Sequence, residues 1–269
     1  MNGLPRGETA VIVGLAIVVA LLWLRARYLR SLEQIASRGR ARGADGVIVG
    51  AEPFTYARPG APAVLLIHGA GDTPQTLRYL GNALYAHGFH VTAPLLPGHG
   101  RSLFEFSHIT ADDLTRCARA AYDELQRRHD WVAIVGLSMG GALAAQLAAG
   151  NDALPALGLV APYLAMPRAA SWAARAAWLW GPILPAVSSS EGVSVLDPDE
   201  RSRNLAYGVF TPAAVRALHE TMRRGVAALP TIVAPTIFMQ STTDNRIATK
   251  DAQRAFDLLG AREKRLEWV

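Results

Sequence analysis

A serine lies between glycines directly after a β-branched run in the segment IVGLSMGGAL, residues 134 to 143. Gly136, Ser138 and Gly140 fit the pattern G-x-S-x-G, which forms a nucleophile elbow when a strand precedes it and a helix follows it. We predict that strand over 131–135 and that helix over 139–149. The glycines leave room for the tight turn, and the helix N-terminus favours developing negative charge. The segment therefore predicts Ser138 as a nucleophile; a purely structural turn is the alternative.

Two glycine-rich loops end other predicted strands. HGAG follows the continuous apolar run Ala63 to Ile67, which is typical of a strand buried on both faces. PGHGRS, residues 97 to 102, follows the strand predicted from His90 to Pro94. A free backbone N–H in the first loop would be able to point at the nucleophile. In a third loop, APTIFMQSTTDNRI places Asp244 after a later predicted strand.

With these motifs the chain resembles the α/β-hydrolase superfamily and, within it, carboxylesterase and monoacylglycerol-lipase-like serine hydrolases. The resemblance runs from about Val47 to the C-terminus and rests on HGAG, PGHGRS, GLSMGG and the acid segment. It implies that Ser138 attacks an ester carbonyl and that the backbone N–H groups of Ala70 and Met139 form the oxyanion hole. It also implies that Asp244 is the catalytic acid, although an aspartate there would also be able to cap the next helix. No metal or organic cofactor is expected.

The catalytic histidine is the missing element of this pattern. In the resembled fold the triad runs serine, acid, histidine in chain order, but all seven histidines of this chain precede Asp244. The resemblance assigns His68 and His99 to loop-shaping positions. We interpret the sequence as a piece of a longer enzyme, without the histidine loop and last helix, and expect the 269-residue chain to be nearly inactive. The alternatives are His219 as an unorthodox base, or a non-catalytic binding relative.

An apolar segment near the N-terminus predicts a transmembrane anchor over 9–25. Ala10 to Leu24 carries no charge, and Arg25, Arg27 and Arg30 follow it. The run is slightly shorter than the ~30 Å hydrocarbon core, but flanking arginines can snorkel. A cleaved signal peptide is the alternative, yet no small-residue cleavage site separates the run from the arginines. The positive flank predicts a single-pass protein whose hydrolase domain is cytoplasmic.

Charge and cysteine content restrict the partners. The chain has a formal net charge of +5 and a pI of about 9.7. Its dense basic cluster runs from Arg25 to Arg42 beside the anchor, which suits anionic headgroups; a merely solvated linker is the alternative. No aromatic-interleaved patch or reader motif accompanies this charge, so we expect no nucleic-acid partner. Cys117, the single cysteine, excludes an intrachain disulfide framework.

The rest of the chain divides into a basic linker over 26–46 and a hydrolase domain over 47–269. Alternating β and α patterns predict an α/β fold with a mostly parallel, doubly covered sheet. The alternation stops over 163–230, which predicts a helical cap insertion containing Trp172, Trp178 and Trp180.

Apolar walls beside a serine nucleophile favour a small hydrophobic ester, such as a monoacylglycerol-like or medium-chain acyl ester. Simple packing of the cap onto the sheet would explain the same tryptophans. The favoured function is a membrane-anchored serine esterase or lipase acting through an acyl-enzyme; the alternative is a catalytically inactive, membrane-tethered binding module.

Overall fold

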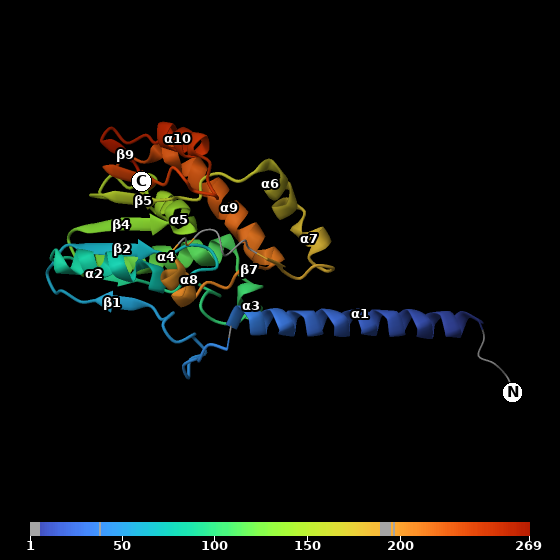
Figure 1. Ribbon diagram of the computed structural model, residues 1–269. Coiled ribbons are helices and arrows are strands. Elements are labelled where there is room, and N and C mark those ends of the chain that lie inside the picture. Colours follow the sequence, from blue (N-terminus) through green and yellow to red (C-terminus); the bar gives the residue numbers. More distant parts are fainter. Residues whose placement is uncertain (1–5, 38, 189–194, 196) are drawn as a thin grey trace.

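The computed structural model describes residues 6–37, 39–188, 195 and 197–269 (Figure 1). Its centre is a seven-stranded sheet in the order β1-β3-β2-β4-β5-β8-β9, in which β1 runs antiparallel to β3 and all other neighbours are parallel. The predicted mostly parallel sheet is therefore confirmed. Its strands are β1 (Phe54–Tyr56), β2 (Ala63–Ile67), β3 (His90–Ala93), β4 (Val132–Leu137), β5 (Leu157–Val160), β8 (Thr236–Gln240) and β9 (Lys264–Trp268).

Helices cover both faces of this sheet, and the α4 helix begins as the sequence predicts. Thr110 and Asp113 form a capping box in which each side chain accepts from the other's backbone N–H. The helices are α1 (Arg6–Ser37), α2 (Arg78–Ala86), α3 (Leu103–Phe106), α4 (Ala111–Gln126), α5 (Met139–Ala148), α6 (Arg168–Arg175), α7 (Ala177–Trp180), α8 (Pro198–Arg203), α9 (Pro212–Ala228) and α10 (Thr249–Leu258), with short 3₁₀ turns at Pro74–Leu77 and Leu229–Thr231.

The two faces of the sheet are covered unequally. On one face, inward residues of the strands pack against α4, α5, α9 and α10 in one large core. On the opposite face, a smaller core joins Val64 and Leu66 of β2 to Leu77, Leu80 and Leu84, which lie on the 3₁₀ turn and α2.

The smaller core thins out toward β8. Register places Leu66, Val135, Gly158 and Ile237 in one row across the α2 face. Leu66 is fully buried, Val135 is half-buried, and Ile237 is 42% exposed. The α2 side of β8 is therefore open to solvent among the described residues.

The first helix differs from the sequence prediction at its C-terminal end. The basic linker is predicted over 26–46, but α1 continues without a break to Ser37. Leu32 and Ala36 on its last turns are buried in the large core. The Glu33 carboxylate accepts from the Leu103 N–H at 2.6 Å and pairs with Arg42 at 2.8 Å. Tertiary contact of these residues with the hydrolase domain thus outweighs the polar character of the local sequence.

A second difference concerns residues 47–49, whose apolar side chains predict a short strand at the start of the domain. Val47 to Val49 forms no strand; Ile48 makes only an isolated bridge to Arg42. Ile48 nevertheless is fully buried, so its burial rather than strand pairing explains the apolar run.

The predicted insertion contains two different kinds of element. The helices α6 and α7 and the short strands β6 (Val187–Ser188) and β7 (Val209–Phe210) lie beyond the sheet. The long helix α9 instead crosses α5 closely: a Cβ at Gly225 would lie 2.9 Å from Ala142. The cap proper is therefore the α6–α7 region, and it stands on α9.

Adjacent residues of β8 test the unequal coverage. Phe238→Ala removes a fully buried ring from the large core, so we expect a loss of about 3–5 kcal/mol in unfolding free energy. Ile237→Ala, on the open face, should cost below about 1 kcal/mol. Urea titrations of both variants measure the difference, and equal losses would show that the α2 face of β8 is covered.

Candidate active site

Ser138 occupies a strained turn between β4 and α5. Its backbone has φ 55° and ψ −119°, a region that residues with a side chain rarely adopt. Three backbone hydrogen bonds hold the turn: the Ser138 N–H donates to the Val160 carbonyl, and the Ser138 carbonyl accepts from Gly141 and Tyr163, each at 2.9 Å. The strained geometry is thus fixed by β5 and by the segment after it.

The flanking glycines are required by contacts with backbone rather than with movable side chains. A Cβ at Gly140 would lie 2.0 Å from the Ile67 carbonyl oxygen, and one at Gly136 would lie 2.1 Å from the Gly140 carbonyl oxygen. These distances are far inside van der Waals contact, so β2, β4 and α5 approach closely only because both side chains are absent.

The HGAG loop after β2 runs beside the serine. A Cβ added to Gly69 would lie 3.3 Å from the Ser138 Cβ and 3.7 Å from its Oγ. Ala70 is the next residue of this loop and is half-buried, whereas Met139 is buried at the first position of α5. Because the first N–H groups of a helix have no intrahelical acceptor, Met139 offers a donor directly beside the hydroxyl.

Two buried histidines shape the loops around the serine. His68 Nε2 accepts from the Leu96 N–H at 3.0 Å, so Nδ1 carries the proton and donates to the Gly69 carbonyl at 2.9 Å. The His99 ring packs edge-on against His68 and bonds through Nδ1 to the Pro97 carbonyl. Burial holds the pKa of His68 well below its usual value and lowers that of His99 to about 4. Both rings are therefore neutral structural groups.

Two further polar side chains support these loops, and sequence reasoning did not single them out. Tyr207 donates to the Gly98 carbonyl and accepts from the Arg101 N–H, which fixes the PGHGRS loop. Asp72 follows the HGAG loop and accepts from the Thr73 N–H and the Thr76 hydroxyl. Burial raises the pKa of Asp72 to about 6. The only sequence signal for Asp72 is its adjacency to HGAG, whereas Tyr207 lies far from both motifs in the sequence.

Asp244 lies in the loop after β8, as predicted. Its Oδ1 accepts from the N–H groups of Arg246 and Ile247, at 2.7 and 3.1 Å, and its Oδ2 accepts from Gln240 Nε2 at 2.6 Å. The carboxylate is half-buried. Backbone donors thus orient one oxygen, and the orientation does not depend on the helix α10, whose N-cap is Ala248.

The histidines of the chain make their hydrogen bonds elsewhere. His219 on α9 pairs with Ser171 of α6 at 2.9 Å, so it joins α9 to the cap helix α6. The other six bond to backbone groups or to side-chain hydroxyls, and none of the recorded histidine bonds ends on Ser138 or Asp244. Within the described residues, no cluster of three metal-ligating side chains occurs either.

This combination of a mostly parallel sheet, a serine in a strained strand-to-helix turn and a glycine loop against it defines an α/β hydrolase. The family model described as "Serine aminopeptidase, S33" matches residues 59–269, and the chain belongs to this family.

Similar proteins include esterases and lipases. A thermostable monoacylglycerol lipase from Bacillus sp. (strain H-257) is 30% identical over 82% of this chain and 85% of its own length. A carboxylesterase from Bacillus subtilis (strain 168) is 25% identical over 82% of this chain and 87% of its own length. A solved structure from a study of the metagenome-derived lipolytic enzymes LipS and LipT superposes with a TM-score of 0.73 at 27% identity, covering 83% of this chain and 89% of that one. The chain is accordingly an esterase- or lipase-like hydrolase.

The geometry of the turn at Ser138 predicts that the stability of the protein depends strongly on Gly140. Gly140→Ala forces a methyl group against the Ile67 carbonyl, so we expect a destabilisation of at least ~3 kcal/mol. Gly14→Ala is the control, because no atom lies within 4 Å of the added Cβ. Thermal unfolding in non-ionic detergent compares the two; a Gly140 variant as stable as the control would contradict the close approach.

The buried histidines predict acid sensitivity. A depressed pKa means that the unfolded chain binds the proton more readily, so stability falls as pH drops from about 6.5 toward about 4. His99 should contribute a loss of about 2 kcal/mol between pH 7 and pH 5. Asp72, whose pKa is raised, works in the opposite direction over the same window.

The test is urea unfolding of His99→Asn at pH 7 and pH 5. We expect the loss of unfolding free energy between pH 7 and pH 5 to be smaller by about 2 kcal/mol than in the wild type. His87→Asn, at an exposed position, serves as the control and should leave the difference unchanged. An unaltered pH dependence in His99→Asn would show that His99 does not titrate as its burial implies.

Proposed function

We propose that this protein is a serine hydrolase that cleaves carboxylic esters through an acyl-enzyme on Ser138. The observation that carries the proposal is the strained backbone of Ser138 beside the HGAG loop, where a Cβ on Gly69 would lie 3.3 Å from the Ser138 Cβ. Strain of this kind persists only where surrounding packing enforces it, and it is concentrated at functional sites. A plain turn would not need three backbone bonds and two glycines to hold a serine at φ 55°.

In the proposed reaction the Ser138 Oγ attacks the ester carbonyl carbon. The carbonyl oxygen becomes an oxyanion, which the N–H groups of Ala70 and Met139 stabilise from the loop and from the helix start. Collapse of this intermediate expels the alcohol and leaves an ester on Ser138. Water then attacks the acyl group and regenerates the hydroxyl.

Asp244 takes the role of the acid that orients a histidine. Two backbone N–H groups fix its Oδ1, which is the support that such a carboxylate needs to hold an imidazole in one tautomer. Every histidine of the sequence precedes Asp244, and none of the recorded histidine bonds ends on Ser138 or Asp244 among the described residues. We therefore propose that the 269-residue chain, taken alone, is nearly inactive.

The substrate class that we propose is a monoacylglycerol-like or other acyl ester. The curated relatives similar over more than four-fifths of the chain are a monoacylglycerol lipase and a carboxylesterase. The cap adds apolar surface, since Trp172 and Trp178 are largely exposed.

We further propose that α1 anchors the protein in a membrane as a single pass. Among the described residues, one helix is long and apolar enough: the span Ala10–Gln34 contains an 18-residue window with a mean hydropathy of 2.1, none of which is buried. Signal sequences and core helices can meet the same length and composition criteria. The arginines after Leu24 favour a cytoplasmic hydrolase domain by the positive-inside rule.

The rival function is a membrane-tethered binding module that has lost catalysis. The observation that favours it is that none of the recorded histidine bonds ends on Ser138 or Asp244 among the described residues. Nucleotide sequence beyond codon 269 discriminates between the two: a continuing frame that encodes a nearby histidine favours the enzyme.

Fluorophosphonate labelling tests the enzyme. A longer chain that includes such a histidine should label at Ser138 and hydrolyse acyl esters, and Ser138→Ala should abolish both. The 269-residue chain should be slower by about 10²–10⁴-fold, the usual contribution of general-base assistance. Rapid ester turnover by the 269-residue chain that disappears in His219→Ala would instead identify the cap histidine as the base.

A further inference from the structure

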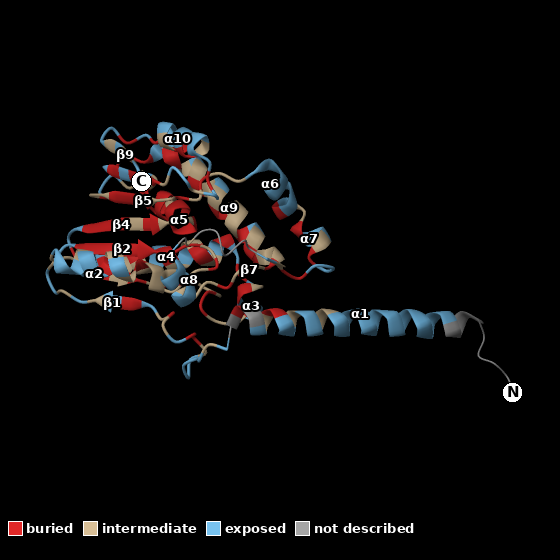
Figure 2. Ribbon diagram, in the orientation of Figure 1, coloured by how far each residue is buried: buried red, intermediate tan, exposed pale blue. Residues whose placement is uncertain are grey.

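We propose that the outer edge of the cap docks into the interface of the lipid leaflet in which the apolar run of α1 ends. This inference rests on the proposed membrane anchoring by α1. The cap edge is defined by five apolar side chains of α6, α7 and the following turn, all at least 42% exposed: Trp172, Trp178, Leu179, Ile183 and Leu184. Figure 2 shows that α6 is largely exposed.

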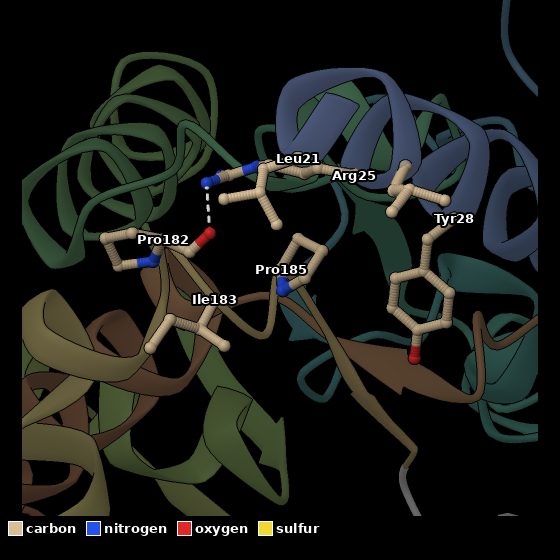
Figure 3. Close-up of a pocket in the computed structure, with 7 residues that line it drawn as sticks. Leu21, Arg25, Tyr28, Pro182, Ile183 and Pro185 are labelled. Atoms are coloured by element: carbon tan, nitrogen blue, oxygen red, sulfur yellow. Dashed lines mark hydrogen bonds between the residues drawn. The ribbon is translucent and has the colours of Figure 1, made fainter. Parts of the chain in front are cut away.

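The level of the cap edge relative to α1 is set by a direct contact. The turn after α7 packs against α1 around a pocket of about 330 Å³, lined on one side by Leu21, Leu24, Arg25 and Tyr28 (Figure 3). On the other side, Pro182, Ile183 and Pro185 line it, and the Arg25 guanidinium donates to the Pro182 carbonyl at 2.7 Å.

These contacts fall where the charge-free run of α1 ends and its arginines begin. With α1 crossing a bilayer, Leu21 and Leu24 lie at the edge of the hydrocarbon and Arg25 lies at headgroup level. The Ile183 side chain, 86% exposed, is thus brought to the same depth as the last apolar turn of α1. Figure 1 shows α7 above the half of α1 that is nearer the domain.

The composition of the cap edge fits this depth. Tryptophans are enriched at the membrane–water interface, where an apolar ring with a polar N–H is best placed. Arg168 and Arg175 are exposed on the same helix as Trp172, and the Arg175 guanidinium lies over the Trp172 ring. Together with Arg25 they provide cations for anionic headgroups, so the edge matches a lipid surface in charge as well as in hydropathy.

The connection to the site gives this docking a consequence for substrate entry. α6 and α7 stand on α9, α9 crosses α5, and α5 begins at the residue after Ser138. A lipid ester would thereby meet the cap while still in the leaflet, close to the element that carries the nucleophile.

Spin-label depth measurements on the full 269-residue chain test the proposal. In a Cys117→Ser background, a nitroxide is attached to Trp178→Cys or Ile183→Cys, and the protein is reconstituted in phosphatidylcholine–phosphatidylglycerol vesicles. Collision rates with oxygen and with a nickel chelate report the depth of each label. Gly14→Cys in α1 controls for anchoring, and Asp152→Cys, in an exposed loop before β5, provides the aqueous reference.

We expect the oxygen-to-nickel ratio at 178 and 183 to exceed that at 152 several-fold, with the highest ratio at 14. Ratios at 178 and 183 equal to that at 152, with 14 in lipid, would overturn the docking and leave the anchor intact. An aqueous ratio at 14 would overturn the anchor itself. Strong dipolar broadening between labels at 183 would assign the cap edge to contact with a second copy of the chain and would also overturn the proposal. None of these measurements depends on ester hydrolysis, so they leave the catalytic assignment separately testable.

Discussion

The contact that the rest of the site depends on is the approach of the α5 start to the end of β2, with no side chain between them. A methyl group at Gly140 would sit 2.0 Å from the Ile67 carbonyl oxygen, so the absence of a side chain permits the serine turn to press against the HGAG loop. Once this approach is made, hydrogen bonds to the Val160 carbonyl and from the Tyr163 N–H keep Ser138 in a conformation that it would not adopt alone. The loop, the helix start and the hydroxyl are then brought together by packing rather than by any polar bond to the hydroxyl itself.

Neutral buried groups maintain the loops on either side of this contact. His68 joins the Leu96 N–H to the Gly69 carbonyl, and His99 packs against it in the neighbouring loop. A charged imidazole at either place would be desolvated without a counter-ion, which is why the pKa of each ring is depressed. The histidines nearest to the nucleophile in the motif loops therefore have a structural part.

Much of this arrangement could be predicted from local sequence, for a physical reason. β2, β4 and β5 are buried on both faces, so they read as continuous apolar runs, and Ser138 and Asp244 follow two strands of one parallel sheet at their carboxyl ends. What could not be predicted depends on partners distant in sequence. Glu33 is the single acidic residue between Arg25 and Arg42, and nothing in the local sequence shows that its carboxylate accepts from the Leu103 N–H, seventy residues away. The apolar residues around Ile48 predict a strand, whereas the Ile48 side chain is buried in the core between loops.

Because Leu32 and Ala36 are buried, the C-terminal turns of α1 are part of the domain core and do not act as a flexible tether. A flexible tether would let the domain rotate freely and take every orientation above a surface. A helix locked into the core by its last turns transmits its own tilt to the whole sheet, so the direction in which the Ser138 hydroxyl faces is tied to the axis of α1. For a protein held at a boundary by that axis, encounter with an amphiphile becomes a search in two dimensions at a fixed height. With α1 in a membrane, as proposed, the tilt of this helix would set which end of an amphiphile meets the site first.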